Sequence, residues 1–545
     1  MKKITRRSFL TACGTVAAAA ALTACGGSSS SSTAASSIAA ASSEAVDNDA
    51  NAGDPVYGGV LKYACHNSVA NCGYTPELTN NAALVVLNTA YESLIDYNED
   101  GTFKPELATE WSTDPDEPSI TWTLQSGVTF TDGTAFNADA VKRNIEEYQT
   151  NQRNEVANIA SCEIIDDTHI KMILKSWNSS TLEGVGFFVY YMSPAALEDV
   201  DSLRSTSCGT GPFKVTEYNP GVSIKYTKNE NYWQDGKPYL DGVEYYIVDE
   251  PTTRASAFQA GEYDIIKMDN LTVASQIKEM GSTSFGKIIH ETNKSGQGLT
   301  GTGLIPNSAD PNSPFADSRV RLAMAEAIDA DALCQAFGYG MLISTNQWAA
   351  PGAITYNTDM DAIHYDVDHA KQLLSEAGYP NGFDTTMTVN AGNKDIFTAA
   401  ANMLDEVGIH CTIDLVDDST QTSLYSTGTW EGIMGHYHAI SPDLGLYMGR
   451  HLDVDGAFYA KGIQHPQDAM DLLEEIRTAK TDADKVDCEW KMQELIYNHE
   501  NGTALFGRPL FIQNQPIFKY DYVHGDNTSV CHMASWDIGN CWMSK

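Results

Sequence analysis

The chain has 545 residues, and its 34 Lys and Arg against 72 Asp and Glu give a formal net charge of −38 at pH 7. Such an acidic surface repels the phosphates of nucleic acids and the headgroups of anionic membranes, so both are excluded as partners. The length exceeds the ~250–300 residues at which a single hydrophobic core usually divides. The sequence therefore predicts two or three domains.

The first 24 residues predict an export signal. Four basic residues precede an apolar stretch from Leu10 to Ala24, which is shorter than the ~20 residues that a spanning helix needs. The tetrapeptide LTAC ends at both Cys13 and Cys25, and only Cys25 leaves a complete apolar region in front of it. We therefore expect lipidation, with acyl chains such as palmitate, at Cys25. The run TRRSFL resembles a twin-arginine signal, and an ordinary secretory signal with two adjacent arginines is the alternative.

Residues 25–55 are rich in Ser and Ala and predict a flexible tether without a core of its own. Together, tether and lipid predict an extracytoplasmic protein held at the cell membrane (outer face or periplasm) by the anchor alone. Nine cysteines follow Cys25, an odd number that leaves at least one unpaired. Cys65/Cys72 and Cys531/Cys541 are close enough in sequence to be disulfide candidates, and most others are expected as buried thiols.

The first half of the chain predicts short strands and helices in turn. A helix is expected over 84–97, then strands within ITWTLQSGVTF, then a helix capped by Asn137. Two hairpins follow, the second turning at the tripeptide NPG, and after them a strand, a helix and a strand. These later segments read EIIDDTHIKMIL, FKVTEYNPGVSIKYT, VEYYIV, TTRASAFQAG and YDII.

The second half predicts an α/β lobe with parallel strands. Helices are expected over DSRVRLAMAEAIDADALCQAF, DVDHAKQLLSEAG and KDIFTAAANMLDEVG, the first two capped by Asp317 and Asp366. Strands TTMTVNA, HCTIDLVD and WEGIMGHYHA alternate with them or follow. In such lobes, ligands bind beyond the carboxyl ends of the strands. We therefore expect ligand contacts in the tail of the last strand, GHYHAISPD.

Several long motifs, in order, resemble the family 5 extracellular solute-binding proteins, which are the dipeptide, oligopeptide and nickel receptors of ABC importers. They are YESLIDYNEDGTFKPELATEW, WTLQSGVTFTDGTAFNADAVKRNIE, CGTGPFKVTEYNPGVSIKYTKNENYWQDGKPYLDGVEYYIV and SPFADSRVRLAMAEAIDADAL. The resemblance implies an α/β fold like that of the periplasmic binding proteins (type II, cluster C), with two lobes, a hinge and an extra inserted domain. It places the crossovers near residues 295 and 505. The implied parts are lobe I (56–88, 205–295 and 505–545), inserted domain II (89–204) and the α/β lobe III (296–504).

The resemblance also implies a function: capture of a small solute between two lobes and its delivery to an ABC permease, by a monomer without a cofactor. A secreted enzyme exported by the twin-arginine route is the first alternative. The chain lacks the H-E-x-x-H, G-x-S-x-G, phosphate-loop and dinucleotide-binding motifs that would favour it. A lipoprotein sensor or adhesin on the same scaffold is the second, and the sequence leaves it open.

The resemblance suggests nine ligand-binding residues. For each of them, a role as a loop or packing residue is the alternative to ligand binding. They are Asn67, Ser68, Met268, Asp269, Asn270, Trp348, His436, Tyr437 and His438. In peptide receptors of the family, an aspartate near the end of the last strand meets the ammonium group of the ligand. That position is Ala439 here, and Asp443 comes four residues later.

The departure at Ala439 puts an ordinary peptide ligand in doubt, because a buried ammonium group without a counter-charge is costly. The solute classes that stay open are a peptide, a nickel chelate, haem or another small solute. His436 and His438 share one face of a strand and could point two imidazoles at a metal complex. Hydrogen bonding within the lobe is the alternative. The run DVDG at 453–456 gives a weak calcium signal.

Overall fold

The computed structural model describes residues 53–66, 68–78, 83–98, 102–291, 300–440, 443–454, 456, 459–513, 516–527 and 536–545. The predicted export signal, the lipidation site at Cys25, most of the tether and Asn67 lie outside these residues. Within them, no helix combines the length and the hydropathy that crossing a bilayer requires.

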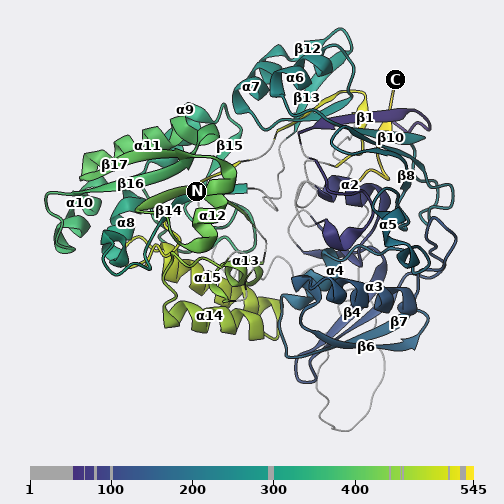
Figure 1. The fold of residues 1–545 in the computed structure, drawn as a ribbon, viewed down its shortest axis with the longest axis horizontal. Helices are drawn as coiled ribbons and strands as arrows, with labels where there is room; N and C mark the ends of the chain where they lie inside the picture. The colour runs from purple at the N-terminus through teal and green to yellow at the C-terminus, as the bar shows by residue number, and fades with distance from the viewer. Residues whose placement is uncertain are drawn as a thin grey trace, which may run out of the picture. The chain divides into compact units, whose positions relative to one another are not determined.

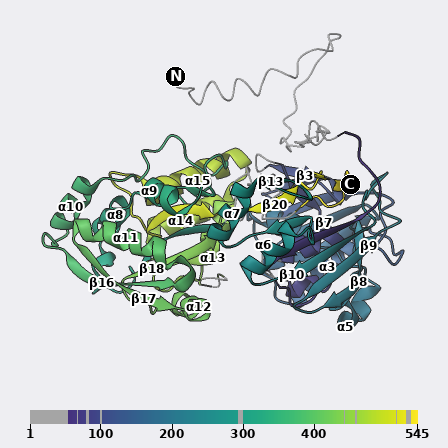
Figure 2. The ribbon, with the colours of Figure 1, turned by 90° about the horizontal axis from the view of Figure 1, so that it is seen from above.

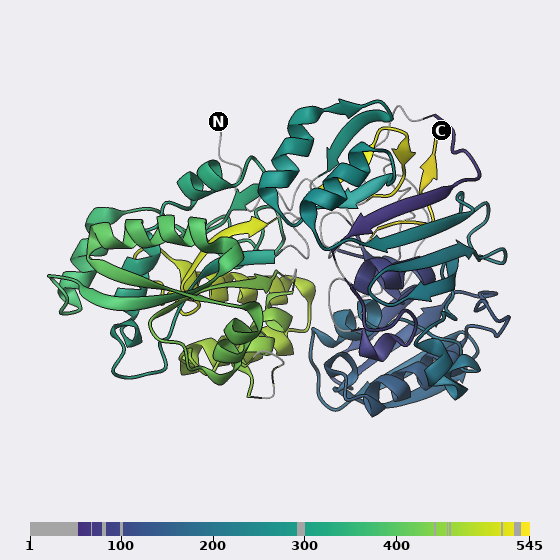
Figure 3. The same ribbon diagram turned by 45° about the horizontal axis from the view of Figure 1, so that its top comes forward.

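An eight-stranded mixed sheet gathers strands from three distant parts of the sequence (Figures 1 and 3). Its order is β12-β13-β20-β11-β1-β10-β9-β8, and β1 pairs in parallel with both β10 and β11. The strands are β1 (Val60–Cys65), β8 (Phe213–Asn219), β9 (Ser223–Lys228), β10 (Gly242–Ile247), β11 (Ile265–Lys267), β12 (Ser282–Thr283), β13 (Gly286–Glu291) and β20 (Ile517–Tyr520). The helices α6 (Pro251–Gln259) and α7 (Leu271–Met280) lie between its strands in sequence. The predicted hairpin β8–β9 and the strand β10 are confirmed.

A four-stranded antiparallel sheet, β4-β5-β7-β6, lies in the region predicted as the inserted domain. Asn137 caps α3 as predicted, since its side chain accepts a hydrogen bond from the Ala140 amide at 3.0 Å. The elements are β2 (Ile95–Tyr97), β3 (Phe103–Pro105), β4 (Ala108–Asp114), β5 (Ser119–Leu124), β6 (Ile159–Asp166), β7 (His169–Leu174), α3 (Ala138–Thr150), α4 (Thr181–Phe187) and α5 (Val200–Leu203).

The helix predicted over 84–97 is wrong in its second half. The helix α2 (Ala83–Ala90) ends at Ala90, and the chain then enters the short strand β2. The Leu94 amide donates to the Gly186 carbonyl at 2.9 Å instead of to the helix. Tertiary hydrogen bonds therefore override the continuous apolar pattern on which the prediction was based.

A six-stranded sheet, β15-β19-β14-β18-β16-β17, forms the second large layer. Its β16 pairs in parallel with β17 and β18, so the predicted parallel α/β unit is confirmed. The strands are β14 (Thr300–Pro306), β15 (Leu342–Ser344), β16 (Phe383–Asn390), β17 (Ile409–Val416), β18 (Ile433–Ala439) and β19 (Arg508–Gln513). Figure 1 shows α11 lying along β16 and β17.

The helices of this part are α8 (Ser318–Glu326), α9 (Ala330–Phe337), α10 (Val367–Glu376), α11 (Lys394–Val407), α12 (Asp418–Thr427), α13 (Leu444–Leu452), α14 (Gln467–Thr478) and α15 (Asp482–Tyr497). Asp317 and Asp366 cap α8 and α10 as predicted. The single helix predicted from Asp317 onward is two helices, because Asp329 caps α9 through the Ala332 amide and starts a new helix. Figure 2 shows α14 and α15 side by side, in agreement with their direct contact.

The remaining elements are short. They are η1 (Thr75–Glu77), η2 (Asn154–Val156), η3 (Ala196–Glu198), η4 (Pro314–Ala316), η5 (Ala391–Asn393), β21 (Val523–His524) and β22 (Trp542–Met543). Shortly after the crossover predicted near residue 505, Arg508–Gln513 form β19 within the six-stranded sheet, and β20 then joins the eight-stranded one. The predicted crossovers and the division into domains stay predictions.

The candidate pair Cys65 and Cys72 is not joined by a disulfide. Cys72 is a buried free thiol whose sulfur faces the carbonyls of Arg204 and Thr206 at 3.9 and 3.8 Å. The sulfur of Cys65 instead lies 2.6 Å from the hydroxyl oxygen of Tyr245 on the neighbouring strand. The loop after β1 thus carries the two residues to different partners. Cys541 is also a buried free thiol, and Cys531 lies outside the described residues.

Candidate solute-binding site

The strand β18 carries the two histidines that the sequence singled out. It lies between β14 and β16, and it pairs His436 with Gly303 and His438 with Gly301. The backbones of Tyr437 and His438 belong to the strand, but their side chains lie outside the description, as does that of Ala439. The structure therefore describes the surroundings of only one of the paired imidazoles.

The imidazole of His436 packs within the lobe. Its ring centroid lies 4.6 Å from that of Tyr425, which stacks on Trp430 at 5.7 Å and hydrogen bonds to Nδ1 of His451 at 2.9 Å. Burial lowers the pKa of His436 to about 4, so the ring is neutral at physiological pH. These contacts favour packing for His436, although a neutral imidazole also has the protonation state that a metal chelate would require.

Trp348 is 2 % exposed and packs beneath β14. Its ring centroid lies 6.2 Å from that of Tyr447. A Cβ atom at Gly301 would come within 2.6 Å of the indole, and one at Gly303 within 3.1 Å. The two glycines therefore make room for the indole, which is placed here as part of the core.

The predicted segment 268–270 follows the end of β11 and is held by polar contacts. Met268 is fully buried, and the carboxylate of Asp269 forms an ion pair with Arg254, whose side chain is also fully buried. Asn270 caps α7, since its side-chain oxygen accepts from the Val273 amide at 3.0 Å. All three side chains thus have structural roles within the chain.

Around Asp269, the structure also gathers His66 and Gln513, while Ser68 is exposed in the nearby loop. Nδ1 of His66 lies 3.7 Å from the Asp269 carboxylate, and Nε2 of Gln513 donates to the Asp269 carbonyl at 3.4 Å. Burial lowers the pKa of His66, and Asp269 opposes that shift. Because Gln513 ends β19, this hydrogen bond joins the two large sheets.

Asp443, the nearest acid to the position of Ala439, is neutralised by the chain itself. It is 5 % exposed, forms an ion pair with Lys485 and accepts a hydrogen bond from the Leu446 amide at 2.7 Å as the cap of α13. Burial opposes the charged form of Asp443, yet Lys485 holds its pKa below the ordinary value. The counter-charge of Asp443 is therefore supplied by Lys485 from within the chain.

Two further carboxyl groups lie in the same buried cluster. Burial, reinforced by Asp443, raises the pKa of Glu183 to about 8. Burial also raises that of Glu489 to about 8, although Lys485 opposes the shift. Glu183 comes from α4 of the predicted inserted domain, whereas Lys485 and Glu489 come from α15. The cluster therefore joins two parts of the chain through charge.

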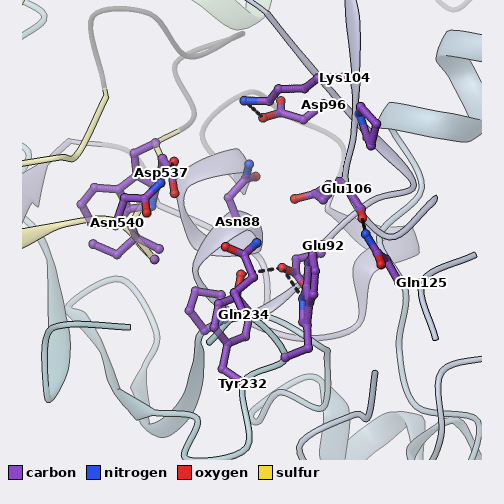
Figure 4. A pocket seen from close by; sticks show the side chains of 16 residues that line it. Asn88, Glu92, Asp96, Lys104, Glu106, Gln125, Tyr232, Gln234, Asp537 and Asn540 are labelled. Carbon is purple, nitrogen blue, oxygen red and sulfur yellow. Dashed lines mark hydrogen bonds and ion pairs between the residues drawn. The ribbon is translucent and has the colours of Figure 1, made fainter. Parts of the chain in front are cut away.

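A separate cavity of about 160 Å³ is lined by acidic and amide side chains (Figure 4). Its volume is below the ~300–1,000 Å³ usual for small-molecule sites. Glu92 accepts hydrogen bonds there from the Tyr232 hydroxyl at 2.8 Å and from the Trp233 indole at 2.9 Å, and Asp96 pairs with Lys104 at 2.9 Å. The acids that line it are already satisfied, so we do not assign the solute to this cavity.

The structure thus brings the 268–270 segment together with His66, Arg254 and Gln513, while Trp348 and His436 each pack in their own surroundings. The sequence analysis missed Arg254, Lys485 and Gln513. Each is an ordinary polar residue in a helix or at a strand end, and only the tertiary structure shows that it faces a predicted site residue. The weak calcium signal at 453–456 finds no support at Asp453, whose carboxylate pairs with Arg477.

The layers described above define a binding-protein fold. The structure resembles that of NikA from Brucella suis in complex with Fe(III)-EDTA, with a TM-score of 0.75 over 89 % of this chain and 100 % of that chain at 20 % identity. At this identity, the likeness establishes the fold alone. It confirms the prediction of an α/β fold like that of the periplasmic binding proteins.

Residues 102–458 match the family described as bacterial extracellular solute-binding proteins, family 5. The matched segment is more than half of the chain, and the chain belongs to this family. It is 28 % identical over 380 residues to heme-binding protein A of Haemophilus influenzae, covering 63 % of this chain and 67 % of that protein. It is 29 % identical over 345 residues to the glutathione-binding protein GsiB of Escherichia coli, covering 61 % of this chain and 65 % of that protein. These relatives are named as binding proteins.

Proposed function

We propose that this chain is the solute-binding receptor of an ABC importer, held at the outer surface of the cell membrane through lipid on Cys25. It captures one small solute between its two lobes as a monomer and presents it to the permease subunits. Membership of family 5 carries the proposal. The proposed contacts are drawn from the nine residues that the resemblance suggests, and those with described side chains include the exposed Ser68 and the partly exposed Asp269. His66 and Gln513 join them because they lie beside Asp269.

The described acids near these residues indicate the chemistry of the solute. Lys485 pairs with the buried Asp443, and Arg254 pairs with Asp269, which is 35 % exposed. A free ammonium group of a ligand would therefore compete with a cation of the chain at either acid, and would have to displace it at Asp443. Breaking a buried ion pair costs several kcal/mol. We therefore propose a solute whose main anchor is not an ammonium group: an uncharged or anionic molecule, or a metal chelate. The relative named for heme and the solved structure with bound Fe(III)-EDTA fit this range. Glutathione, for which the other relative is named, is anionic overall but carries a free ammonium group, so it tests the proposal directly.

The decisive experiment compares matched ligands with and without a free ammonium group. Thermal-shift measurements on the purified chain would use haem, glutathione, a ferric EDTA chelate and a dipeptide panel, each peptide also in its N-acetylated form. A ligand at 100 times its Kd raises the stability of the folded chain by about 2.7 kcal/mol. We expect any peptide that binds to keep its affinity on acetylation, within about threefold.

Loss of more than about tenfold on acetylation would overturn this assignment of the solute and return Asp443 or another acid to the ammonium site. Turnover of the bound solute by pure protein would overturn the receptor assignment itself. The anchor is tested separately: Cys25→Ser should release the protein from the membrane fraction, and Cys13→Ser should not. Release by neither change would contradict lipidation at Cys25.

A further inference from the structure

A second group of histidines faces a buried carboxylate away from the residues described above. Glu326 is the last residue of α8, and its side chain is fully buried. Nδ1 of His369 lies 2.8 Å from Oε2 of Glu326, and Nδ1 of His499 lies 2.9 Å from Oε1. Each oxygen of one carboxylate therefore has its own imidazole.

Backbone hydrogen bonds hold these three segments in place. The Asp366 amide donates to the Glu326 carbonyl at 2.9 Å, which fixes the start of α10 against the end of α8. The His499 amide donates to the Asp361 carbonyl at 2.8 Å, which fixes the chain after α15 against the loop before α10. The side chains converge because well-paired backbone segments converge, an arrangement suited to a rigid site.

His364 and Asp366 extend the group toward solvent. The ring centroids of His364 and His499 lie 3.9 Å apart, and the side chain of His364 is 51 % exposed. One donor atom from each of Glu326, His369 and His499 lies within 4.8 Å of the others, and the same holds for His364, Asp366 and His499. His499 belongs to both sets, and His364 is the exposed member of the second set.

The buried atoms of the group are incompletely satisfied. Oε1 of Glu326 and Nδ1 of His499 are buried and close together, yet neither makes a hydrogen bond to a described residue. Burial and the neighbouring charge of Asp366 raise the pKa of Glu326 to about 8. Arg508, whose Nη1 donates to the Ile363 carbonyl at 3.1 Å, opposes the shift. A metal ion bound here would coordinate the carboxylate oxygens and the imidazole nitrogens directly and would displace any proton they carry.

We propose that Glu326, His369 and His499 bind a divalent transition-metal ion, with His364 or Asp366 completing the coordination. Zinc fits best, because it takes nitrogen and oxygen ligands in tetrahedral geometry. With bonds of ~2.0–2.1 Å, tetrahedral donors are about 3.3 Å apart. The distances from the Glu326 carboxylate oxygens to Nδ1 of His369 (2.8 Å) and of His499 (2.9 Å) would therefore increase by only a few tenths of an ångström on metal binding.

The test is a zinc titration of the purified chain. The protein is stripped with EDTA, dialysed and titrated with ZnCl₂ at pH 7.5 against a chromophoric zinc indicator, and cobalt(II) is added separately for its visible spectrum. We expect one equivalent of zinc bound with a micromolar or lower Kd, a higher Tm and the intense absorption of tetrahedral cobalt. Glu326→Gln and His499→Ala should each weaken zinc binding at least tenfold.

His410→Ala is the matched control. His410 lies in β17 and is exposed, and its Nδ1 lies 2.5 Å from the carboxylate of Asp405, so it is another histidine–carboxylate pair of the same chain. This variant should leave the stoichiometry and Kd unchanged. If a buried variant fails to fold, His364→Ala gives the same test from the exposed side and should weaken binding several-fold. Absence of stoichiometric zinc, or unchanged binding in Glu326→Gln and His364→Ala, overturns the proposal and leaves histidine–carboxylate ion pairs only.

The proposal stands apart from solute capture. His436→Ala should leave the zinc equivalent in place, since His436 shares no described contact with the three ligands. Failure of the zinc titration would leave the solute screen intact, and failure of that screen would not change the zinc stoichiometry.

Discussion

Asp443 and Glu326 are both buried carboxylates of the segment between residues 300 and 513, and they differ in what neutralises them. Asp443 has the ammonium group of Lys485. Glu326 has one imidazole on each oxygen, with Arg508 nearby but hydrogen-bonded to a carbonyl. The first carboxylate carries its cation within the chain, whereas the second has imidazoles, whose nitrogens can also coordinate an outside cation.

The comparison shows which of the two acidic side chains can bind a cation that does not belong to the chain. From the sequence, Asp443 looked like the acid that could replace the missing aspartate at Ala439, and Glu326 carried no signal at all. In the fold, the partner of each carboxylate determines whether it can bind an external cation. A lysine partner already supplies the positive charge, whereas histidine partners can themselves act as ligands of a metal ion. The predictions below test this difference, from the largest expected effect to the smallest.

Lys485→Met should destabilise the protein by about 3–5 kcal/mol, because it leaves Asp443 buried without its cation. The matched control is Lys491→Met on the same helix, which removes an exposed pair with Asp487 and should leave the unfolding free energy unchanged within error. Urea denaturation followed by circular dichroism measures both. Equal effects of the two changes would show that Asp443 does not depend on Lys485.

His436→Ala should cost about 1–3 kcal/mol, because it empties the space against Tyr425 in a packed region. The same variant should keep its zinc equivalent, whereas His499→Ala should lose it. The pair of variants separates an imidazole used for packing from one used for coordination. A loss of zinc in His436→Ala would remove the distinction drawn between the two groups of histidines.

The Glu183 carboxyl predicts a pH-dependent stability. Its pKa is about 8 in the folded chain against an ordinary value of 4.5, so the folded state binds the extra proton between these values. Its contribution is fully present below pH 4.5 and is lost as the pH rises through 8. The stability of the original chain relative to Glu183→Gln should therefore fall between pH 5 and pH 8, as urea denaturation at several pH values would measure. A constant difference would mean that Glu183 is ionised throughout.

Lys480→Ala should have the smallest effect, within about 0.5 kcal/mol. Lys480 pairs with Asp116, but both side chains are mostly exposed, and water screens such pairs. Thermal and urea denaturation of this variant and of Lys485→Met would give the unfolding free energy that an exposed and a buried lysine–aspartate pair each contribute in the same protein. A loss of more than about 2 kcal/mol would show that this exposed contact is part of a larger network.

Much of the fold could be predicted, because periodicity and capping residues are local signals. Asn137, Asp317 and Asp366 were identified as helix caps and are caps in the structure. The prediction failed where distant hydrogen bonds decide, as at Leu94, which pairs with Gly186 instead of continuing a helix. The sequence likewise left open whether Cys72 pairs with Cys65, because the groups that face Cys72 are more than a hundred residues away in sequence.

The candidate site was less predictable than the fold. The segment 268–270 was identified through the family resemblance, but its ion pair with Arg254 and its contact with Gln513 depend on how the helix α6 and the ends of β11 and β19 meet. The cluster at Glu326 was missed entirely, since its histidines lie at positions 364, 369 and 499 and match no short motif. The spacing of residues in the sequence indicates metal ligands only when those ligands lie in the same helix, strand or loop.

By itself, the sequence determined the acidic character of the chain, the order of its α/β units and the motifs of its family, because these follow from composition and short-range pattern. The tertiary structure alone decided which charges meet. A carboxylate does not encode its partner: Asp443 meets Lys485 of α15, and Glu326 meets histidines from two other segments. Burial strengthens the electrostatic interaction within each of these pairs, because a charge removed from water is stabilised only by the few groups that remain beside it.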